Sequence, residues 1–264
     1  MPRYLILLLL SIVLSPVHAE TSEHHWGFNL TNYLWLPGSE GNMSVGANTK
    51  TVNANFVDIV EKSRRFPLGF NGHFEAHYDK FGFYLDGIYM NIKLKPRFDN
   101  ISGGINSQTG IMDYGLMYRV MGGNAADVRQ YHDKQRPMTL DVYAGARTIW
   151  MGNSLLLSTP HGLFQRTPKM NVSFTSPIIG GRVATDLTEK WFLMLDANVG
   201  GFGAQGVQLT SNLLGAVGYK TSLFDMPVSI EGGYKALYYK VDKNGPTSTN
   251  MTLHGPFLGL TGYF

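Results

Sequence analysis

Apolar and polar residues alternate along most of the chain, from about residue 26 to the C-terminus. Residues 111–120, "IMDYGLMYRV", place an apolar or aromatic side chain at every second position, and 138–150, 191–201 and 228–239 repeat the pattern. A period of two is typical of β-strands whose two faces meet different surroundings. The alternation therefore predicts an all-β protein in which one face of each strand is apolar and the other carries nearly all of the charge.

Ten alternating segments can be marked, an even number, as a membrane barrel with both chain ends on one side requires. They are residues 26–35, 68–79, 82–94, 110–121, 137–151, 173–187, 191–202, 208–220, 228–241 and 251–264. Two shorter stretches, "GNMSV" (41–45) and "TVNANF" (51–56), would add a hairpin and raise the count to twelve. Residues 56–65, "FVDIVEKSRR", do not alternate, and we interpret them as a short helix folded into the barrel mouth.

Aromatic residues indicate which surroundings the apolar faces meet. Tyr and Trp gather at the ends of these faces, whereas glycine interrupts the polar faces. Aromatic girdles around an apolar band mark a transmembrane β-barrel, and a soluble sandwich has no need of them. We therefore expect a closed, antiparallel, up-and-down transmembrane β-barrel.

The connections between the segments agree with a barrel, because short turns and long loops broadly alternate along the chain. Short turns are predicted at 79–82, 188–190 and 222–227. Long polar loops are predicted at 36–55, 95–109 and 152–170. One connection breaks this rule, because residues 122–135 fall on the short-turn side and yet are long.

Composition and the first residues point to the cell envelope. Charged residues are 16% of the chain, where about 25% is usual in soluble domains, and the net charge of +3 gives no reason to expect nucleic acid. Arg3, the apolar run 5–14 and "VHA" before Glu20 predict a signal peptide at 1–19, cleaved after Ala19. We expect one barrel domain over 20–264, and the absence of cysteine excludes disulfides.

The sequence also resembles a known group of proteins. "FEAHYDKFGFYLDGIYMNI", "DVYAGARTIW", "GGRVATDLTEKWFLMLDANVGGFG" and "EGGYKALYYK" are similar to the hairpins of bacterial outer-membrane β-barrels, and most of all to OmpA- or OmpW-like barrels. The resemblance implies location in the outer membrane of a Gram-negative bacterium and contact with its lipid. It also implies that the C-terminal Phe264 is the signal read by the outer-membrane assembly machinery. It implies no particular reaction.

With the apolar faces toward lipid, the polar faces line the lumen. Buried charges must be paired or hydrogen-bonded, so we expect a salt-bridged interior. Arg119, Arg147, Arg182 and Lys235 are expected to pair with Asp86, Asp141, Asp196 and Glu231, with the individual partners left open. The predicted charged residues of the lumen are His73, Glu75, His77, Asp79, Asp86, Asp113, Arg119, Asp141, Arg147, Arg182, Asp196, Lys220, Glu231 and Lys235.

Several functions are compatible with such a lumen. The favoured one is a structural scaffold, and the main alternative is a narrow small-solute pore, because charged lumen residues also tune selectivity. His73, Glu75 and His77 alternate as metal ligands on a strand would, but every segment carries polar residues at that period, so we expect no metal site and no cofactor. No Ser–His–acid pattern stands out, so we expect no enzyme, and a barrel enzyme acting on lipid or peptide is the weakest alternative. Loops 36–66, 95–109 and 152–171 could make the barrel a surface adhesin or receptor.

Overall fold

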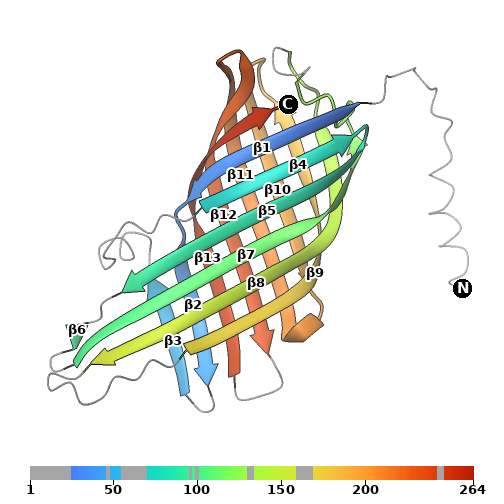
Figure 1. The fold of residues 1–264 in the computed structure, drawn as a ribbon. Helices are drawn as coiled ribbons and strands as arrows, with labels where there is room; N and C mark the ends of the chain where they lie inside the picture. The colour runs from blue at the N-terminus through green and yellow to red at the C-terminus, as the bar shows by residue number, and fades with distance from the viewer. Residues whose placement is uncertain are drawn as a thin grey trace, which may run out of the picture.

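Ten antiparallel strands close into a barrel in the computed structural model of the chain (Figure 1). The structure describes residues 25–45, 48–54, 70–94, 97–98, 101–129, 134–158, 169–242 and 247–264. The predicted all-β barrel and its ten segments are confirmed. The barrel strands are β1 (Trp26–Trp35), β4 (Phe70–Tyr78), β5 (Phe81–Leu94), β7 (Ile101–Met121), β8 (Thr139–Ser158), β9 (Lys169–Asp186), β10 (Trp191–Gly201), β11 (Val207–Leu223), β12 (Met226–Asp242) and β13 (Thr247–Tyr263).

The barrel is closed by the pairing of its first and last strands. β1 pairs with β13 from Asn29↔Tyr263 to Trp35↔Phe257, while its other edge pairs with β4. Beyond that ladder, Phe28 and Phe264 exchange both backbone hydrogen bonds, at 3.1 and 2.9 Å. The start of β1 and the end of β13 therefore lie at one end of the barrel, which we call the terminal end; the opposite end is the far end (Figure 1).

A hairpin follows β1 in the chain and pairs with the same neighbouring strand, β13. β2 (Gly38–Val45) pairs with Thr247–His254 of β13, and β3 (Asn48–Ala54) pairs with β2. Pro37 separates β1 from β2, as expected for a residue that cannot donate to a ladder. The predicted hairpin thus exists, but it prolongs one position of the wall and does not raise the barrel to twelve strands.

The strands also extend into two of the predicted long loops. β7 begins at Ile101, β8 runs to Ser158 and β9 begins at Lys169, while the short β6 (Arg97–Phe98) pairs with the start of β7. These segments belong to the sheet because each pairs with a neighbouring strand. The pairing joins residues far apart in the sequence, so the polarity of the predicted loops did not reveal it. The predicted signal peptide (1–19) and helix (56–65) lie outside the described residues.

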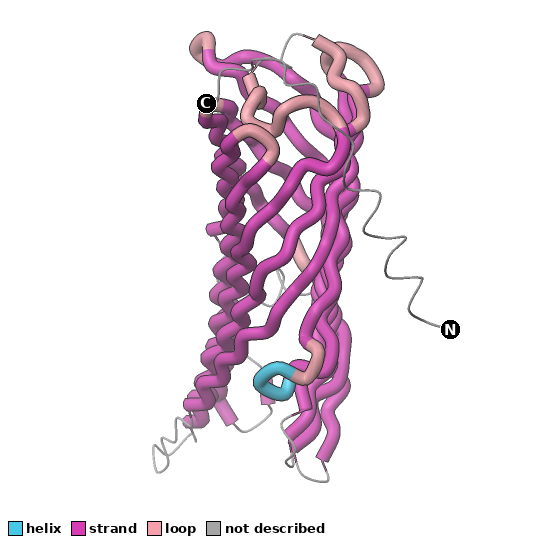
Figure 2. Tube along the Cα trace, turned by 90° about the vertical axis from the view of Figure 1, so that its right-hand side faces the viewer, coloured by secondary structure: helices cyan, strands magenta, loops and turns pink. Residues whose placement is uncertain are grey.

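Helix is rare among the residues that the structure describes. A single turn of 3-10 helix, η1 (Ala204–Gly206), joins β10 to β11 at the far end (Figure 2). No helix in the parts of the chain that the structure describes is long and apolar enough to cross a membrane.

The outward face of the barrel is apolar, with aromatic rings at the terminal end. Trp26 packs against Tyr78 with ring centroids 5.2 Å apart, and Phe81 packs against Tyr118 at 4.9 Å. All four side chains are exposed, as is Leu116 farther up the wall. The apolar faces therefore point outward, as predicted. An apolar band edged by aromatic residues on a closed barrel suits contact with lipid.

Glycine is required on this face where an aromatic ring lies over the backbone. Gly110 of β7 pairs directly with Trp150 of β8, and a Cβ at Gly110 would lie 1.9 Å from the indole. We expect Gly110→Ala to lower the free energy of unfolding by about 1–3 kcal/mol, because the indole must move. Chemical unfolding in detergent micelles measures this. The matched control is Gly215→Ala, whose Cβ meets open space; equal losses in both variants would contradict the explanation.

Candidate functional site

The lumen is divided into a polar half near the terminal end and an apolar half near the far end. The apolar half is filled by one cluster of buried, inward-facing side chains. Its members include Trp35, Ile88, Met90, Ile111, Ile149, Phe174, Val207, Leu237, Tyr239, Val241, Met251, Leu253 and Phe257. In this half the inward positions of the long strands, such as Ile149 and Leu237, are apolar, which the alternation did not reveal.

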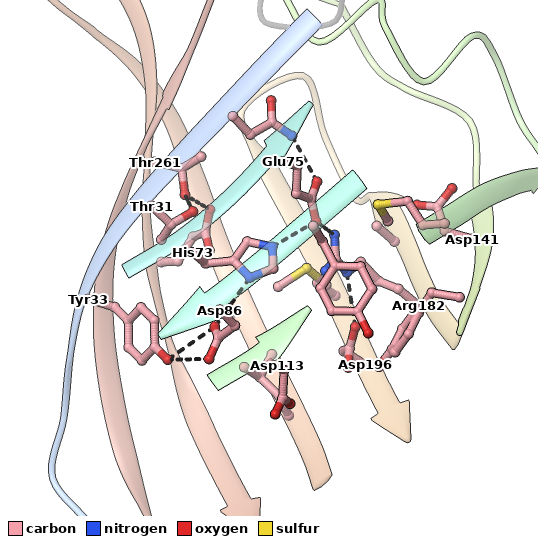
Figure 3. A pocket seen from close by; sticks show the side chains of 18 of the residues that line it. Thr31, Tyr33, His73, Glu75, Asp86, Asp113, Asp141, Arg182, Asp196 and Thr261 are labelled. Carbon is pink, nitrogen blue, oxygen red and sulfur yellow. Dashed lines mark hydrogen bonds and ion pairs between the residues drawn. The ribbon is translucent and has the colours of Figure 1, made fainter. Parts of the chain in front are cut away.

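Glu75 of β4 lies at the centre of the polar half (Figure 3). Its Oε1 is 2.8 Å from His73 Nε2 and also contacts the Arg182 guanidinium. Its Oε2 is 3.0 Å from His77 Nε2 and accepts a hydrogen bond from Asn29 Nδ2 at 3.1 Å. Four donors therefore surround the carboxylate, about the number that its lone pairs can accept. Both histidines of the motif "HFEAH" are explained as partners of the acid between them.

Asp86 of β5 continues this chain of contacts across the lumen. Its Oδ2 lies 3.2 Å from His73 Nδ1, so both ring nitrogens of His73 face carboxylates, which fits a doubly protonated imidazole. Tyr33 OH donates to Asp86 at 3.0 Å. Lys235 of β12 completes the group, with Nζ 3.4 Å from Asp86 Oδ1 and 5.2 Å from the Tyr33 ring centroid. One connected set of charges thus joins strands on opposite sides of the barrel.

A second group surrounds Asp196 of β10. Arg182 of β9 donates from Nε to Asp196 Oδ2 at 3.1 Å, which leaves its other nitrogen for Glu75. Tyr143 OH donates to Asp196 Oδ1 at 2.7 Å and accepts from Asn198 Nδ2 at 3.1 Å. Arg182 therefore connects the Glu75 group to the Asp196 group, and all five side chains act as one hydrogen-bonded unit.

Arg147 of β8 is deeply buried, with 1% of its surface exposed. Its Nε donates to Asp113 Oδ1 at 2.8 Å, and Nη2 to Asp113 Oδ2, in the bidentate arrangement that suits a carboxylate. Nη1 donates to Thr210 Oγ1 at 2.8 Å, and Nη2 also reaches Asn198 Oδ1 at 3.1 Å. The guanidinium is therefore held by β7, β10 and β11 as well as by its own strand.

The remaining predicted residues lie nearer the terminal end. Arg119 pairs bidentately with Asp141 at 2.7 and 3.0 Å. Glu231 Oε1 accepts from the hydroxyls of Ser229 and Thr261, each at 2.7 Å, instead of from one of the predicted cations. Asp79 does not continue the stripe of β4: it lies in the β4–β5 turn with φ 53.

A cavity of about 160 Å³ lies between these groups. Its lining combines carboxylates and cations with the apolar side chains of Met117, Met194 and Leu214. Among the described residues, no group of three or more His, Asp or Glu side chains is placed to hold a metal ion. The carboxylates and imidazoles are turned toward one another, so the arrangement suits a paired interior with room for a few water molecules.

The unusually long connection between β7 and β8 packs against the terminal mouth in its two described parts, residues 122–129 and 134–138, which together we call the strap. Ala125 and Ala126 are buried, and Ala126 N donates to Asp79 O at 3.0 Å. A small cavity of about 30 Å³ separates strap residues such as Asn124 from the lumen side chains of His77 and Arg119. The strap therefore lies directly beside the charged half of the lumen, at the terminal end.

A buried carboxylate anchors the second part of the strap. Asp186, at the end of β9, accepts from the backbone N of Arg136 at 2.6 Å and lies 3.5 Å from its guanidinium. Lys220 of β11 contacts the same carboxylate and donates to Lys134 O at 3.2 Å. The predicted lumen residue Lys220 is thus part of the strap anchor. Sequence reasoning recognised that the strap is too long for a turn but missed Arg136 as a ligand of Asp186.

Similar solved structures are barrels of low sequence identity. The outer membrane protease OmpT from Escherichia coli is 9% identical with a TM-score of 0.45, over 94% of this chain and 99% of that chain. The attachment invasion locus protein Ail of Yersinia pestis is 10% identical with a TM-score of 0.40, over 90% and 99%. The translocator domain of the autotransporter NalP from Neisseria meningitidis is 10% identical with a TM-score of 0.38, over 99% and 95%. No protein-family model matches the chain, and no curated protein matches it in sequence.

The location of the protein follows from its own architecture. In hydrocarbon every backbone group must be paired internally, and a closed barrel achieves this with strands. This chain closes its barrel through β1 and β13, exposes an apolar band outward and places its charges inside. The start of β1 and the end of β13 both lie at the terminal end, where short turns also join β4 to β5, β9 to β10 and β11 to β12. Short turns are typical of the periplasmic end of such a barrel. The chain is an outer-membrane β-barrel of ten strands.

Proposed function

We propose that the protein is a structural outer-membrane barrel with a sealed lumen, working as a scaffold without catalysis or a cofactor. The apolar filling of the far half of the lumen carries this proposal. Ile149, Phe174 and Leu237 are each at most 2% exposed and occupy the space that a channel would need for water. A narrow apolar constriction excludes water and thereby blocks ions. The strap supports the same proposal, because it covers the other mouth.

Planar-bilayer recording tests the sealed lumen. We expect folded protein, identified by its heat-modifiable migration on gels, to give no channel steps, because the lumen is closed by two different seals. Regular steps from the folded wild-type protein would contradict the proposal.

A narrow pore is the second candidate, favoured by the 160 Å³ cavity and its charges of both signs. In a strap-gated pore, a solute would cross once the strap moved aside and the apolar half opened with it. A variant whose residues 123–135 are replaced by a short turn separates the candidates. The scaffold stays silent because the apolar half remains closed, whereas a strap-gated pore conducts. Adding Ile149→Ser and Leu237→Ser also makes the apolar half polar at two of its most buried positions. Channel steps from this third protein would show that the recording detects an open lumen.

A further inference from the structure

One carboxylate of the lumen has no cationic partner among the described residues. Glu231 of β12 is 7% exposed and lines the cavity of about 160 Å³. Its Oε1 accepts from the hydroxyls of Ser229 and Thr261, each at 2.7 Å, and no described residue donates to its Oε2. Every other carboxylate that lines this cavity contacts an arginine or a lysine: Glu75, Asp86, Asp113, Asp141 and Asp196. A buried charge is costly unless it is paired, so Glu231 offers the cavity an acceptor and a negative charge.

Two short chains of hydroxyl groups end on this carboxylate. Thr31 Oγ1 lies 2.8 Å from Thr261 Oγ1 (Figure 3), and Tyr263 OH lies 2.8 Å from Ser229 Oγ. Thr261 gives its single hydroxyl hydrogen to the carboxylate, so Thr31 is the donor to Thr261. By the same count, Tyr263 donates to Ser229. Both chains therefore run toward Glu231, and the oxygens of Thr31 and Tyr263 keep lone pairs that no described residue uses.

The unused acceptors lie together on neighbouring strands. Thr31 of β1 pairs directly with Thr261 of β13, and Asn29 pairs with Tyr263 on the same two strands. Asn29 Oδ1 is buried, and no described residue donates to it. With the oxygens of Thr31, Tyr263 and Glu231, this carbonyl belongs to a cluster of acceptors that needs hydrogen-bond donors.

Glycine leaves space beside the carboxylate, and apolar side chains follow. Gly259 of β13 pairs with Glu231 on one side and with Tyr33 on the other, so no side chain stands between these two. Phe257, two residues farther along β13 and so about 7 Å nearer the far end, lines the same cavity, as does Leu214. The cavity therefore has a polar, negatively charged part near the terminal end and an apolar part beyond it.

We propose that this part of the lumen binds a small primary amine with an apolar body. An ammonium group has three N–H donors and a positive charge, which suit the cluster of acceptors and the Glu231 carboxylate. The body of the amine would lie against Phe257 and Leu214. An anion would be repelled by Glu231, and a site with a single carboxylate does not suit a divalent metal ion.

The amine would reach this site from the terminal end. Asn29 and Tyr263, which contribute acceptors to the cluster, also line the small cavity of about 30 Å³ beside the strap. The apolar half of the lumen takes no part in binding and stays closed whether or not an amine is bound. The site therefore goes beyond a structural role, and its test is independent of the conductance recordings.

Equilibrium dialysis of the folded barrel tests the site. The protein is refolded in detergent micelles together with labelled phenethylamine, so that the strap does not limit access. We expect saturable binding of one amine per barrel. Glu231→Gln keeps the shape of the side chain and removes its charge, so it should weaken binding by about tenfold or more, the usual effect of losing a charged hydrogen-bond partner. Asp141→Asn neutralises a carboxylate of the same cavity that pairs with Arg119 and should leave the affinity unchanged.

A neutral ligand and a second variant complete the test. Phenethyl alcohol has the same body without the charge and should bind about tenfold more weakly than the amine. Thr31→Val removes one acceptor while keeping the side-chain shape and should weaken amine binding about fivefold. If Glu231→Gln does not give a heat-modifiable barrel, these two measurements decide, and unchanged affinity in both would overturn the site. The proposal also fails if the wild-type protein shows no saturable binding, if Glu231→Gln binds as tightly as the wild type, or if potassium chloride displaces the amine at equal concentration, because the site would then hold an inorganic cation.

Discussion

Arg147→Ala is expected to lower the free energy of unfolding by about 3–5 kcal/mol, the usual loss when one partner of a buried ion pair is removed. The guanidinium is 1% exposed and donates to Asp113 at 2.8 Å and to Thr210 at 2.8 Å. Without it, the Asp113 carboxylate loses its bidentate partner inside a lumen where little water can replace it. Urea unfolding of the protein in lipid vesicles, followed by tryptophan fluorescence, measures the change.

Two further variants show whether burial or mere charge causes the loss. Lys190→Ala removes an exposed charge from the β9–β10 turn and should change the stability by no more than about 0.5 kcal/mol. The double variant Arg147→Met, Asp113→Leu removes both charges and should recover much of the stability, because apolar replacements of a buried pair are often neutral. A loss for Arg147→Ala no larger than for Lys190→Ala would show that the network does not stabilise the barrel.

The fold could be predicted from the sequence because a barrel wall separates two solvents. A strand such as 228–239 has to alternate, since one face meets lipid and the other the lumen, and a shift by one residue would reverse every side chain. The strand ends were harder to predict. Residues 101–109 are polar and still pair with β8. Their hydrogen-bond partners are distant in sequence, so the polarity of the segment did not predict this pairing.

The sequence predicted which residue types line the lumen but not which of these side chains contact one another. Alternation placed Glu75, Arg182 and Asp196 in the lumen, but their contacts depend on which strands face each other across the barrel. Tyr143 alternates in step with Asp141 and Arg147, yet its bond to Asp196 joins residues 53 apart in the sequence. The apolar far half went unnoticed because residues such as Ile149 share a face with Arg147. Their presence shows that the charged network occupies only the half of the lumen near the terminal end.

Glu75→Ala is expected to lower the free energy of unfolding by an amount similar to Arg147→Ala, about 3–5 kcal/mol. Glu75 is 3% exposed and accepts from Arg182, His73, His77 and Asn29, so its removal leaves several buried donors without an acceptor. Asn29 belongs to β1, the strand that closes the barrel against β13. The loss should therefore also lower the yield of heat-modifiable barrel, measured by folding into vesicles and gel migration.

A double-mutant cycle with Arg182→Ala shows whether Glu75 acts through its charge partner. Arg182 also holds Asp196 at 3.1 Å, so Arg182→Ala alone should be destabilising as well. If the two residues stabilise the lumen as one unit, Glu75→Ala combined with Arg182→Ala should be less destabilising than the sum of the single variants by about 0.5–3 kcal/mol. A matched cycle of Glu75→Ala with Arg119→Ala, whose partner is Asp141, should be additive within about 0.5 kcal/mol. Additivity in both cycles would mean that the carboxylate is held by the histidines and not by Arg182.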